Sequence, residues 1–566
     1  MRVDGNSVRE THAILADTSC TSSDRHGEVF TRRWVVELML DLVGYDSDLD
    51  LANKTIVEPS CGTGGFLLPI VDRLIGSCRD NGRPMSETST AIRAHELLAH
   101  NAEIARKEVA KRLLEVGETI ELAEQLASMW VTTDDFLLAD YSKDSVDFVV
   151  GNPPYIRLED LSKDLRAAYR SAWPSMWGRA DIYVGFFEKG LALLKPNAKL
   201  MFVCADRWMH NQYGARLRSI VSDQYAMDCL VVAHDADLFE HEVAAYPAIT
   251  LLRHGEQAKT RIVETRPSFN ANTSQAIRSW VRGEEDVIPI SDAFDASELD
   301  GWFAGDTLWP TGSPNELELI SELEGRFSRL EASSPATRIG IGVATGCDEI
   351  YIQSGAPDVE EDRLLPLTMS SDLSTGGLEW SGRYLVSPWA EGRLVDLDLY
   401  PRLAAFYGKH GKRIRGRHVA KKRPDSWYRT IDRIDPELRS RPKLLLPDLK
   451  ASSHPVLDRG DFYPHHNLCY VVSEDWDLEV LGGILLSGIA DLFVRAYCVK
   501  MRGGTLRFQA QYVRQIRVPS PGSISDDACA ALRRAFQARD REAANRAAAA
   551  AYGIDRSRIS SGDAPG

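Results

Sequence analysis

Paired cysteines and long apolar runs are scarce in this sequence, and Lys and Arg are outnumbered by Asp and Glu. The nine cysteines are scattered without a Cys-x-x-Cys pair, so we expect reduced thiols rather than disulfides or zinc ligands. The most apolar run, Val480 to Ala490, is far shorter than the roughly 20 residues that a membrane helix needs. The first thirty residues contain no secretory core. These absences predict a cytoplasmic protein with no membrane partner and no metal site.

The formal net charge of −15 at first argues against a nucleic-acid partner. However, residues 402–450 hold fifteen Lys and Arg against five Asp and Glu. A basic segment on an acidic chain is typical of a DNA-binding surface on an enzyme, although a solvated charge is the alternative for any single residue. We expect the DNA contacts from this segment, and from a later basic loop, to include Lys412, Arg413, Arg415, Arg417, Lys421, Lys422, Arg423 and Arg502.

The tetrad Asn152-Pro153-Pro154-Tyr155 follows an apolar run, Val146 to Val150, that reads as a buried parallel strand. Because proline cannot donate to a sheet, the strand must end here. Ligands in open α/β sheets bind beyond the carboxyl ends of the strands. We therefore expect the Asn152 amide and the Pro153 carbonyl to accept from an amino group, while the Tyr155 ring stacks on its plane. An ordinary proline-rich turn is the alternative.

A glycine-rich loop, Glu58 to Phe66, lies between a strand at 54–57 and a helix at 67–75. Strand, loop and helix in this order begin a doubly wound α/β fold. The loop departs from G-x-G-x-x-G, and an acidic residue precedes it, which suits a cofactor with an ammonium group and no phosphate. S-adenosylmethionine fits this requirement.

Acidic residues follow the next two predicted strands. Glu96, after a weak strand at 90–94, is the candidate for the ribose hydroxyls, although a solvated acid is an equal alternative. After the third strand, 130–133, we expect Asp135 to accept from the adenine amino group and Phe136 to cover the edge of the ring.

Thr31 occupies the expected N-cap of a helix at 33–43, a position that can also receive a carboxylate. Plain capping is the alternative for this residue. The alternation of strands and helices to about residue 205 predicts a parallel sheet, and strands at 230–233 and 248–252 fit an antiparallel edge.

We expect five regions along the chain. They are a flexible arm at 1–26, a catalytic domain at 27–255, a polar junction at 256–335, a second domain at 336–521, and a C-terminal helix with a disordered tail at 522–566.

Together these motifs resemble the gamma-class N6-adenine DNA methyltransferases, the TaqI-like enzymes of restriction–modification systems. The resemblance rests on the tetrad at 152–155, on the Glu-Pro-x-Cys-Gly-x-Gly-Gly-Phe loop before it, and on a long C-terminal region beginning near Arg338. It implies a doubly wound AdoMet-dependent methyltransferase fold with a C-terminal α+β target-recognition domain. It also implies methyl transfer to an adenine flipped out of double-stranded DNA.

The resemblance assigns roles to further residues. Thr31 would bind the AdoMet carboxylate, although Arg32 follows it where such enzymes have proline. Phe186 would lie against the cofactor adenine, and Phe239 would stack with Tyr155 on the target base. The expected cofactor-binding residues are Thr31, Glu58, Pro59, Cys61, Gly62, Gly64, Glu96, Asp135, Phe136 and Phe186.

Three alternatives remain at this point. A protein-glutamine or RNA methyltransferase can carry the same tetrad, but lacks a recognition region of this size. A non-catalytic DNA-binding modification subunit is disfavoured by the intact tetrad. We expect no fused nuclease, because only about 26 residues precede the first motif, although a separately encoded restriction endonuclease is a candidate companion. We expect the chain to act as a monomer.

Overall fold

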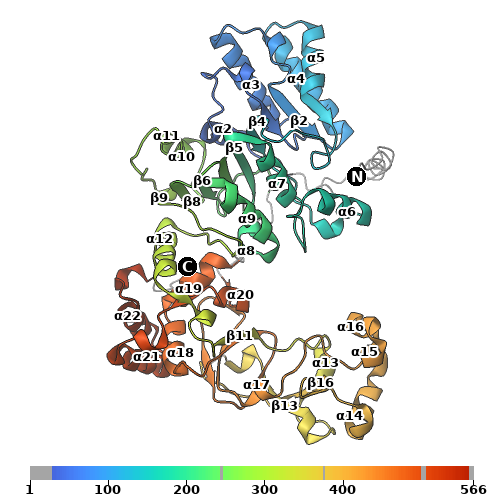
Figure 1. Cartoon of the computed structure of the whole chain (residues 1–566), viewed down its shortest axis with the longest axis vertical. Coiled ribbons are helices and arrows are strands. Elements are labelled where there is room, and N and C mark those ends of the chain that lie inside the picture. The colour runs from blue at the N-terminus through green and yellow to red at the C-terminus, as the bar shows by residue number, and fades with distance from the viewer. Residues whose placement is uncertain (1–28, 242–246, 374–375, 499–504, 560–566) are drawn as a thin grey trace. The chain divides into compact units, whose positions relative to one another are not determined.

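The computed structural model of the chain (Figure 1) describes residues 29–241, 247–373, 376–498 and 505–559. The chain divides into two compact units, residues 1–318 and 319–566. Each unit has its own sheets and its own core.

The first unit is built around a nine-stranded sheet of order β3-β2-β1-β4-β5-β7-β6-β8-β9. Within this sheet β4 (Val146–Gly151) pairs in parallel with β1 (Ile56–Glu58) and with β5 (Leu194–Ala205). The glycine and two prolines that end β4 place the tetrad at the carboxyl edge of the sheet, as the sequence predicts. The other strands are β2 (Ile92–Glu96), β3 (Val131–Thr133), β6 (Tyr225–Val232), β7 (Pro247–His254), β8 (Thr260–Thr265) and β9 (Phe294–Leu299).

Alternate residues of β4 enter different cores, because successive side chains of a strand point to opposite faces of the sheet. Phe148 and Val150 pack with α2 (Arg33–Val43), α3 (Leu67–Asp80), α4 (Ala99–Glu115) and α5 (Ile120–Trp130). Val149 packs with α6 (Lys163–Ala172), α7 (Tyr183–Leu193) and α9 (Ala215–Gln224). Helices therefore cover both faces, which confirms the doubly wound α/β class.

Two predictions about the end of this sheet are wrong. The strands near 230 and 250 do pair antiparallel, as β6 and β7, but they are not the edge, because β8 and β9 extend the sheet to residue 299. The predicted junction at 256–335 therefore contains two strands of the first unit. Its helix α12 (Pro314–Arg326) includes the boundary between residues 318 and 319.

The second unit contains two four-stranded sheets. One has the order β11 (Arg338–Ile341), β21 (Leu468–Val472), β17 (Lys443–Pro447) and β19 (Val456–Asp458), all antiparallel. The other has the order β12 (Ile352–Ser354), β14 (Arg383–Val386), β13 (Leu364–Thr368) and β20 (Tyr463–Pro464). The basic segment forms the short helices α14 (Pro401–Lys409), α15 (Gly411–Gly416) and α16 (His418–Lys422) (Figure 1).

The C-terminal region differs from the prediction of one helix and a disordered tail. It forms two packed helices, α21 (Asp526–Ala538) and α22 (Arg541–Tyr552), because Arg539 adopts a left-handed φ of 57° and reverses the chain. A 3-10 turn at Arg556–Arg558 follows, while residues 560–566 lie outside the described residues.

Among the described residues no single helix meets the length and apolarity required to cross a membrane. The bent pair α18 (Leu478–Leu486) and α19 (Gly488–Tyr497) meets them only when joined across a 63° bend.

Close packing of α7 on the sheet depends on Gly190. A Cβ atom there would lie 2.6 Å from Leu200 Cδ1 and 3.3 Å from Val149 Cγ1. Gly190→Ala should therefore lower the free energy of unfolding by about 1–3 kcal/mol, measured by urea denaturation. The matched control is Gly325→Ala in α12, where a Cβ meets no atom within 4 Å and where alanine should instead stabilise the helix. Equal effects at both sites would contradict this account.

Candidate active site

A cavity opens in the first unit where β1, β2 and β4 end. Most of the predicted cofactor residues line it, together with Asn152 and Pro154 of the tetrad. The lining residues are Val29, Phe30, Thr31, Pro59, Ser60, Cys61, Gly62, Gly65, Phe66, Glu96, Leu97, Leu98, Asp134, Asp135, Phe136, Asn152, Pro154, Ile156, Tyr169, Ile182 and Phe186.

Five predicted site residues lie outside this lining, namely Glu58, Gly64, Pro153, Tyr155 and Phe239. Tyr155 packs against the core that contains α7, and its hydroxyl is buried without a hydrogen-bond partner. Phe239 is 5% exposed and packs in the core on the opposite face of the sheet. Neither ring lines this cavity, so their stacking on a base stays a prediction.

The side chain of Asn152 has a fixed orientation. Its Nδ2 donates to the Val29 carbonyl at 2.9 Å and to Thr31 Oγ1 at 3.1 Å. Its Oδ1 is buried and has no hydrogen-bond partner. Both amide hydrogens are therefore used, and the amide offers only an acceptor to the cavity that it lines.

The glycine loop is held by the strand that follows it. Cys61 N donates to the His95 carbonyl at 2.8 Å, and Gly62 N donates to Glu96 Oε2 at 2.9 Å. Gly62 has a left-handed φ of 53°, and a Cβ at Gly62 or at Gly65 would meet no atom within 4 Å. Since both glycines line the cavity, their missing side chains leave space for a ligand beside the loop backbone.

The two acids at the strand ends are positioned by hydrogen bonds. Glu96 accepts from the amides of Gly62 and Leu98, and Asp135 accepts from the Tyr169 hydroxyl at 2.6 Å and from the Leu137 amide at 2.9 Å. Burial, together with the neighbouring Asp135 charge, raises the pKa of Tyr169, so this phenol remains a donor. Sequence reasoning did not find Tyr169, because it lies 34 residues beyond its partner in an otherwise polar helix.

Glu58 ends β1 and is 1% exposed, with an Oε2 atom that has no partner. Burial, and to a lesser degree the nearby Glu96, raises the pKa of Glu58 well above its usual value. Because Glu58 does not line the cavity, a contact between its carboxyl and the ammonium of the cofactor stays a prediction.

The prediction that Thr31 caps α2 is wrong. The N-cap is Arg32, whose side chain makes no capping hydrogen bond, and Thr31 instead accepts from Asn152. Its hydroxyl nevertheless lines the cavity, so its expected role at the cofactor stays open.

Lys189 is the functional candidate that sequence reasoning missed. It is 1% exposed, donates to the carbonyls of Phe136 and Ala139, and lies 4.8 Å from the centre of the Phe136 ring. Phe136 in turn packs on Phe186, with ring centres 5.3 Å apart. A single lysine within the apolar run of α7 was the available signal, because a buried cation needs a specific partner.

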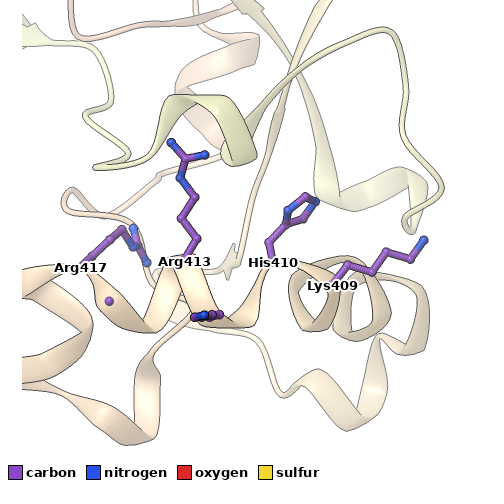
Figure 2. A pocket seen from close by; sticks show the side chains of 6 residues that line it. Lys409, His410, Arg413 and Arg417 are labelled. Carbon is purple, nitrogen blue, oxygen red and sulfur yellow. The ribbon is translucent and has the colours of Figure 1, made fainter.

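The basic segment forms an open hollow of about 640 Å³ in the second unit, lined by Lys409, His410, Lys412, Arg413, Gly416 and Arg417. Figure 2 shows the side chains of Lys409, His410 and Arg413 projecting from this run of short helices. Arg413 forms an exposed ion pair with Glu349. Arg415 lies 3.9 Å from the centre of the Trp427 ring.

Arg417 also has a structural role. Its guanidinium donates to the carbonyls of Thr345, Trp427 and Arg429, and to the Tyr351 hydroxyl. These bonds hold the loops of the unit together, and a contact between Arg417 and DNA stays a prediction. Arg502 lies outside the described residues.

In the described part of the second unit, one group brings together side chains of the kinds that bind metals, and the expected absence of a metal site stays a prediction. Ligand atoms of Asp348, His465 and His466 lie within 4.8 Å of one another. Asp348 is already hydrogen-bonded to Thr345 and to His465 Nε2, the latter at 3.1 Å. These contacts describe a polar network that joins two loops.

Comparison with known proteins identifies the family. The chain is 43% identical to the Type II methyltransferase M.PaeR7I of Pseudomonas aeruginosa, over 96% of this chain and 95% of that protein. It is a Type II DNA methyltransferase of restriction–modification systems. It is also 41% identical to the Type II methyltransferase M.XhoI of Xanthomonas vasicola, over 94% of this chain and 98% of that one.

Two further comparisons agree with this family. The model of the Eco57I restriction-modification methylase family matches residues 79–239. The solved structure of the Type IIL restriction-modification enzyme MmeI with DNA has the same fold, with a TM-score of 0.54 and 14% identity over 92% of this chain and 74% of that one.

Methyltransferases of this family and fold depend on S-adenosylmethionine, and the cavity fits that molecule. The space beside Gly62 and Gly65 accommodates a ligand, and the acids Glu96 and Asp135 stand at the ends of consecutive strands. The rings of Phe136 and Phe186, tilted by 31° to one another, both line the cavity and supply aromatic surface for an adenine. The lining includes acidic side chains and no basic side chain, which suits a cationic ligand that has no phosphate.

The buried amine of Lys189 should give the methyltransferase a distinctive response to pH. Burial lowers the pKa of Lys189 to about 8, although Asp135 and Asp134 oppose this change. Because the unfolded chain then binds more protons between about pH 8 and 10.5, stability from this group rises with pH in that range. The unfolding free energy of the wild type relative to Lys189→Met should increase by about 1–2 kcal/mol between pH 7.5 and 9.5, measured in urea. A constant difference would show that the amine titrates normally.

Proposed function

We propose that this Type II methyltransferase transfers a methyl group to the N6 amino group of an adenine flipped out of duplex DNA. The observation that supports the proposal is the buried, unpartnered Oδ1 of Asn152 at the cavity. Because both N–H groups of the Asn152 amide are already hydrogen-bonded, the amide can only accept through Oδ1. It therefore recognises a group that donates hydrogen bonds, such as an exocyclic amino group.

The chain's residues would raise the reactivity of that amino group. Its lone pair is delocalised into the purine ring, so it is a weak nucleophile. Acceptance of its two hydrogens by Asn152 Oδ1 and by the Pro153 carbonyl favours a pyramidal nitrogen as positive charge develops. Bound S-adenosylmethionine supplies an electrophilic methyl group. The remaining contribution is positioning, for which the rigid end of β4 is suited.

The adenine is inaccessible within a duplex, so the proposal includes base flipping. Tyr155 and Phe239 are the proposed stacking residues, and each has to move into the opening for that role.

The basic segment of the second unit is the proposed phosphate-binding surface. Lys412, Arg413, Lys421 and Lys422 are exposed on its helices, and a stacked Arg415–Trp427 pair lies beside them. Lys and Arg contacts to phosphates fix the position of a protein on DNA without reading its sequence.

Substitution of Asn152 tests the chemistry. Asn152→Ala should reduce single-turnover methylation by a factor of about 100 to 1,000, as expected for loss of one transition-state hydrogen bond. Asn152→Asp keeps an acceptor and should be less affected. Nucleosides from plasmid DNA methylated in cells would be separated by mass spectrometry, with N6-methyladenine as the expected product. N4-methylcytosine would reassign the substrate, and a normal rate for Asn152→Ala would remove this residue from the mechanism.

Salt titration tests the DNA surface. The triple variant Lys412→Ala, Lys421→Ala and Lys422→Ala should reduce the slope of log affinity against log salt by about 2–3, because each lost phosphate contact releases about one ion fewer. DNA affinity would be measured by fluorescence anisotropy between low and moderate salt. A control variant with Lys107, Lys111 and Lys143 replaced by alanine loses the same charge from the first unit. An equal change in both variants would exclude a specific surface on the basic segment.

A further inference from the structure

Two short segments of the first unit pair beside the tetrad. We call residues 29–32 the strap and residues 237–240 the clamp. Thr31 of the strap and Phe239 of the clamp form an antiparallel bridge. Two backbone hydrogen bonds of 2.9 Å flank it, from Arg32 N to the Leu238 carbonyl and from Glu240 N to the Phe30 carbonyl.

The strap is also what orients Asn152. Both hydrogen-bond acceptors of the Asn152 Nδ2 belong to it, namely the Val29 carbonyl and Thr31 Oγ1. If the strap moved away, the amide could rotate about its last side-chain bond, and Oδ1 would no longer be the only group presented to the cavity. The orientation of the acceptor therefore depends on a segment more than 120 residues away in the chain.

Arg32 joins strap and clamp in two ways. Its backbone N–H donates to Leu238, and its guanidinium forms a 2.5 Å ion pair with Asp237. Since Arg32 makes no side-chain capping bond to α2, the side chain contributes to the clamp contact rather than to the start of the helix.

The clamp is itself attached to the sheet. His234, which follows β6, forms a 2.8 Å contact from Nε2 to Oδ2 of Asp206, which follows β5. Both side chains are less than a tenth exposed. Because β5 adjoins β4, this buried pair fixes the base of the clamp to the same edge of the sheet that carries Asn152.

We propose that Arg32 is a positioning residue for methyl transfer. By holding the strap to the clamp, it keeps the Asn152 acceptor directed at the target amino group and couples that acceptor to the segment carrying Phe239. This inference rests on the proposed function of Asn152. A purely structural role would confine Arg32 to stabilising the start of α2.

The test separates these roles with substitutions at one position. Arg32 has φ −59°, which proline adopts without strain, so Arg32→Pro removes the N–H and the ion pair while it keeps the backbone path. Arg32→Ala removes only the ion pair. Single-turnover methylation of unmethylated plasmid DNA with tritium-labelled S-adenosylmethionine should fall about 5–10-fold for Arg32→Pro and about 2-fold for Arg32→Ala.

The decisive measurement repeats Arg32→Pro in an Asn152→Asp background. An aspartate at 152 cannot donate to the Val29 carbonyl, so residue 152 no longer forms that hydrogen bond with the strap. The second substitution should then lower the rate by less than about 2-fold, because its effect acts through residue 152. Loss of the same factor in both backgrounds would overturn the proposal, as would an unchanged rate for Arg32→Pro in the wild-type background.

Two controls complete the design. Arg33→Ala alters the adjacent arginine, which pairs with Glu37 and Asp72 and not with the clamp, so its rate should equal that of the wild type. Asp237→Ala removes the ion pair from the clamp side and should reproduce Arg32→Ala, which keeps the test available if the proline variant folds poorly. If Asn152→Asp and Asn152→Ala both react at the normal rate, the proposed function fails, and not the role of Arg32 alone.

Discussion

The candidate active site of the first unit depends on the hydrogen bonds of one side-chain amide, that of Asn152. The two hydrogens of Asn152 are used by the strap, and its oxygen is left buried without a partner. A buried polar atom of this kind costs free energy in the empty protein, which a ligand with a suitable donor recovers on binding. The end of β4, the glycine loop and the strap all serve to hold that atom in place.

The same principle applies to the cofactor side of the cavity. Glu58, Glu96, Asp135 and Lys189 are charged or potentially charged groups in a poorly hydrated region, and each forms a hydrogen bond with the backbone. A site assembled from such groups is rigid, because moving any one of them breaks bonds that water cannot easily replace. Rigidity is what a reaction limited by alignment requires.

The sequence alone predicts the elements of the site that neighbouring residues form. Each of these elements is encoded within a few consecutive residues. They are a strand that ends at a glycine and two prolines, a glycine loop after a short strand, and acids at strand ends. The hold on Asn152 by Val29 and Thr31 was not predictable, because the partners are distant in sequence and one of them is a backbone carbonyl. Strands β8 and β9 were missed, since both carry several polar residues that resemble a linker. The bonds of Arg417 to carbonyls were not predictable, because composition cannot distinguish an arginine that binds carbonyls from one that faces solvent.

In the sheet β7 lies between β5 and β6, so the connection from β6 to β7 lies on the far side of β4 from the glycine loop. A change in the length of this connection would leave the pairing of β1, β2 and β3 intact, since these strands pair only with one another and with β4. It would displace the clamp, which this connection carries. The glycine loop and the clamp thus belong to opposite halves of the sheet, with β4 between them.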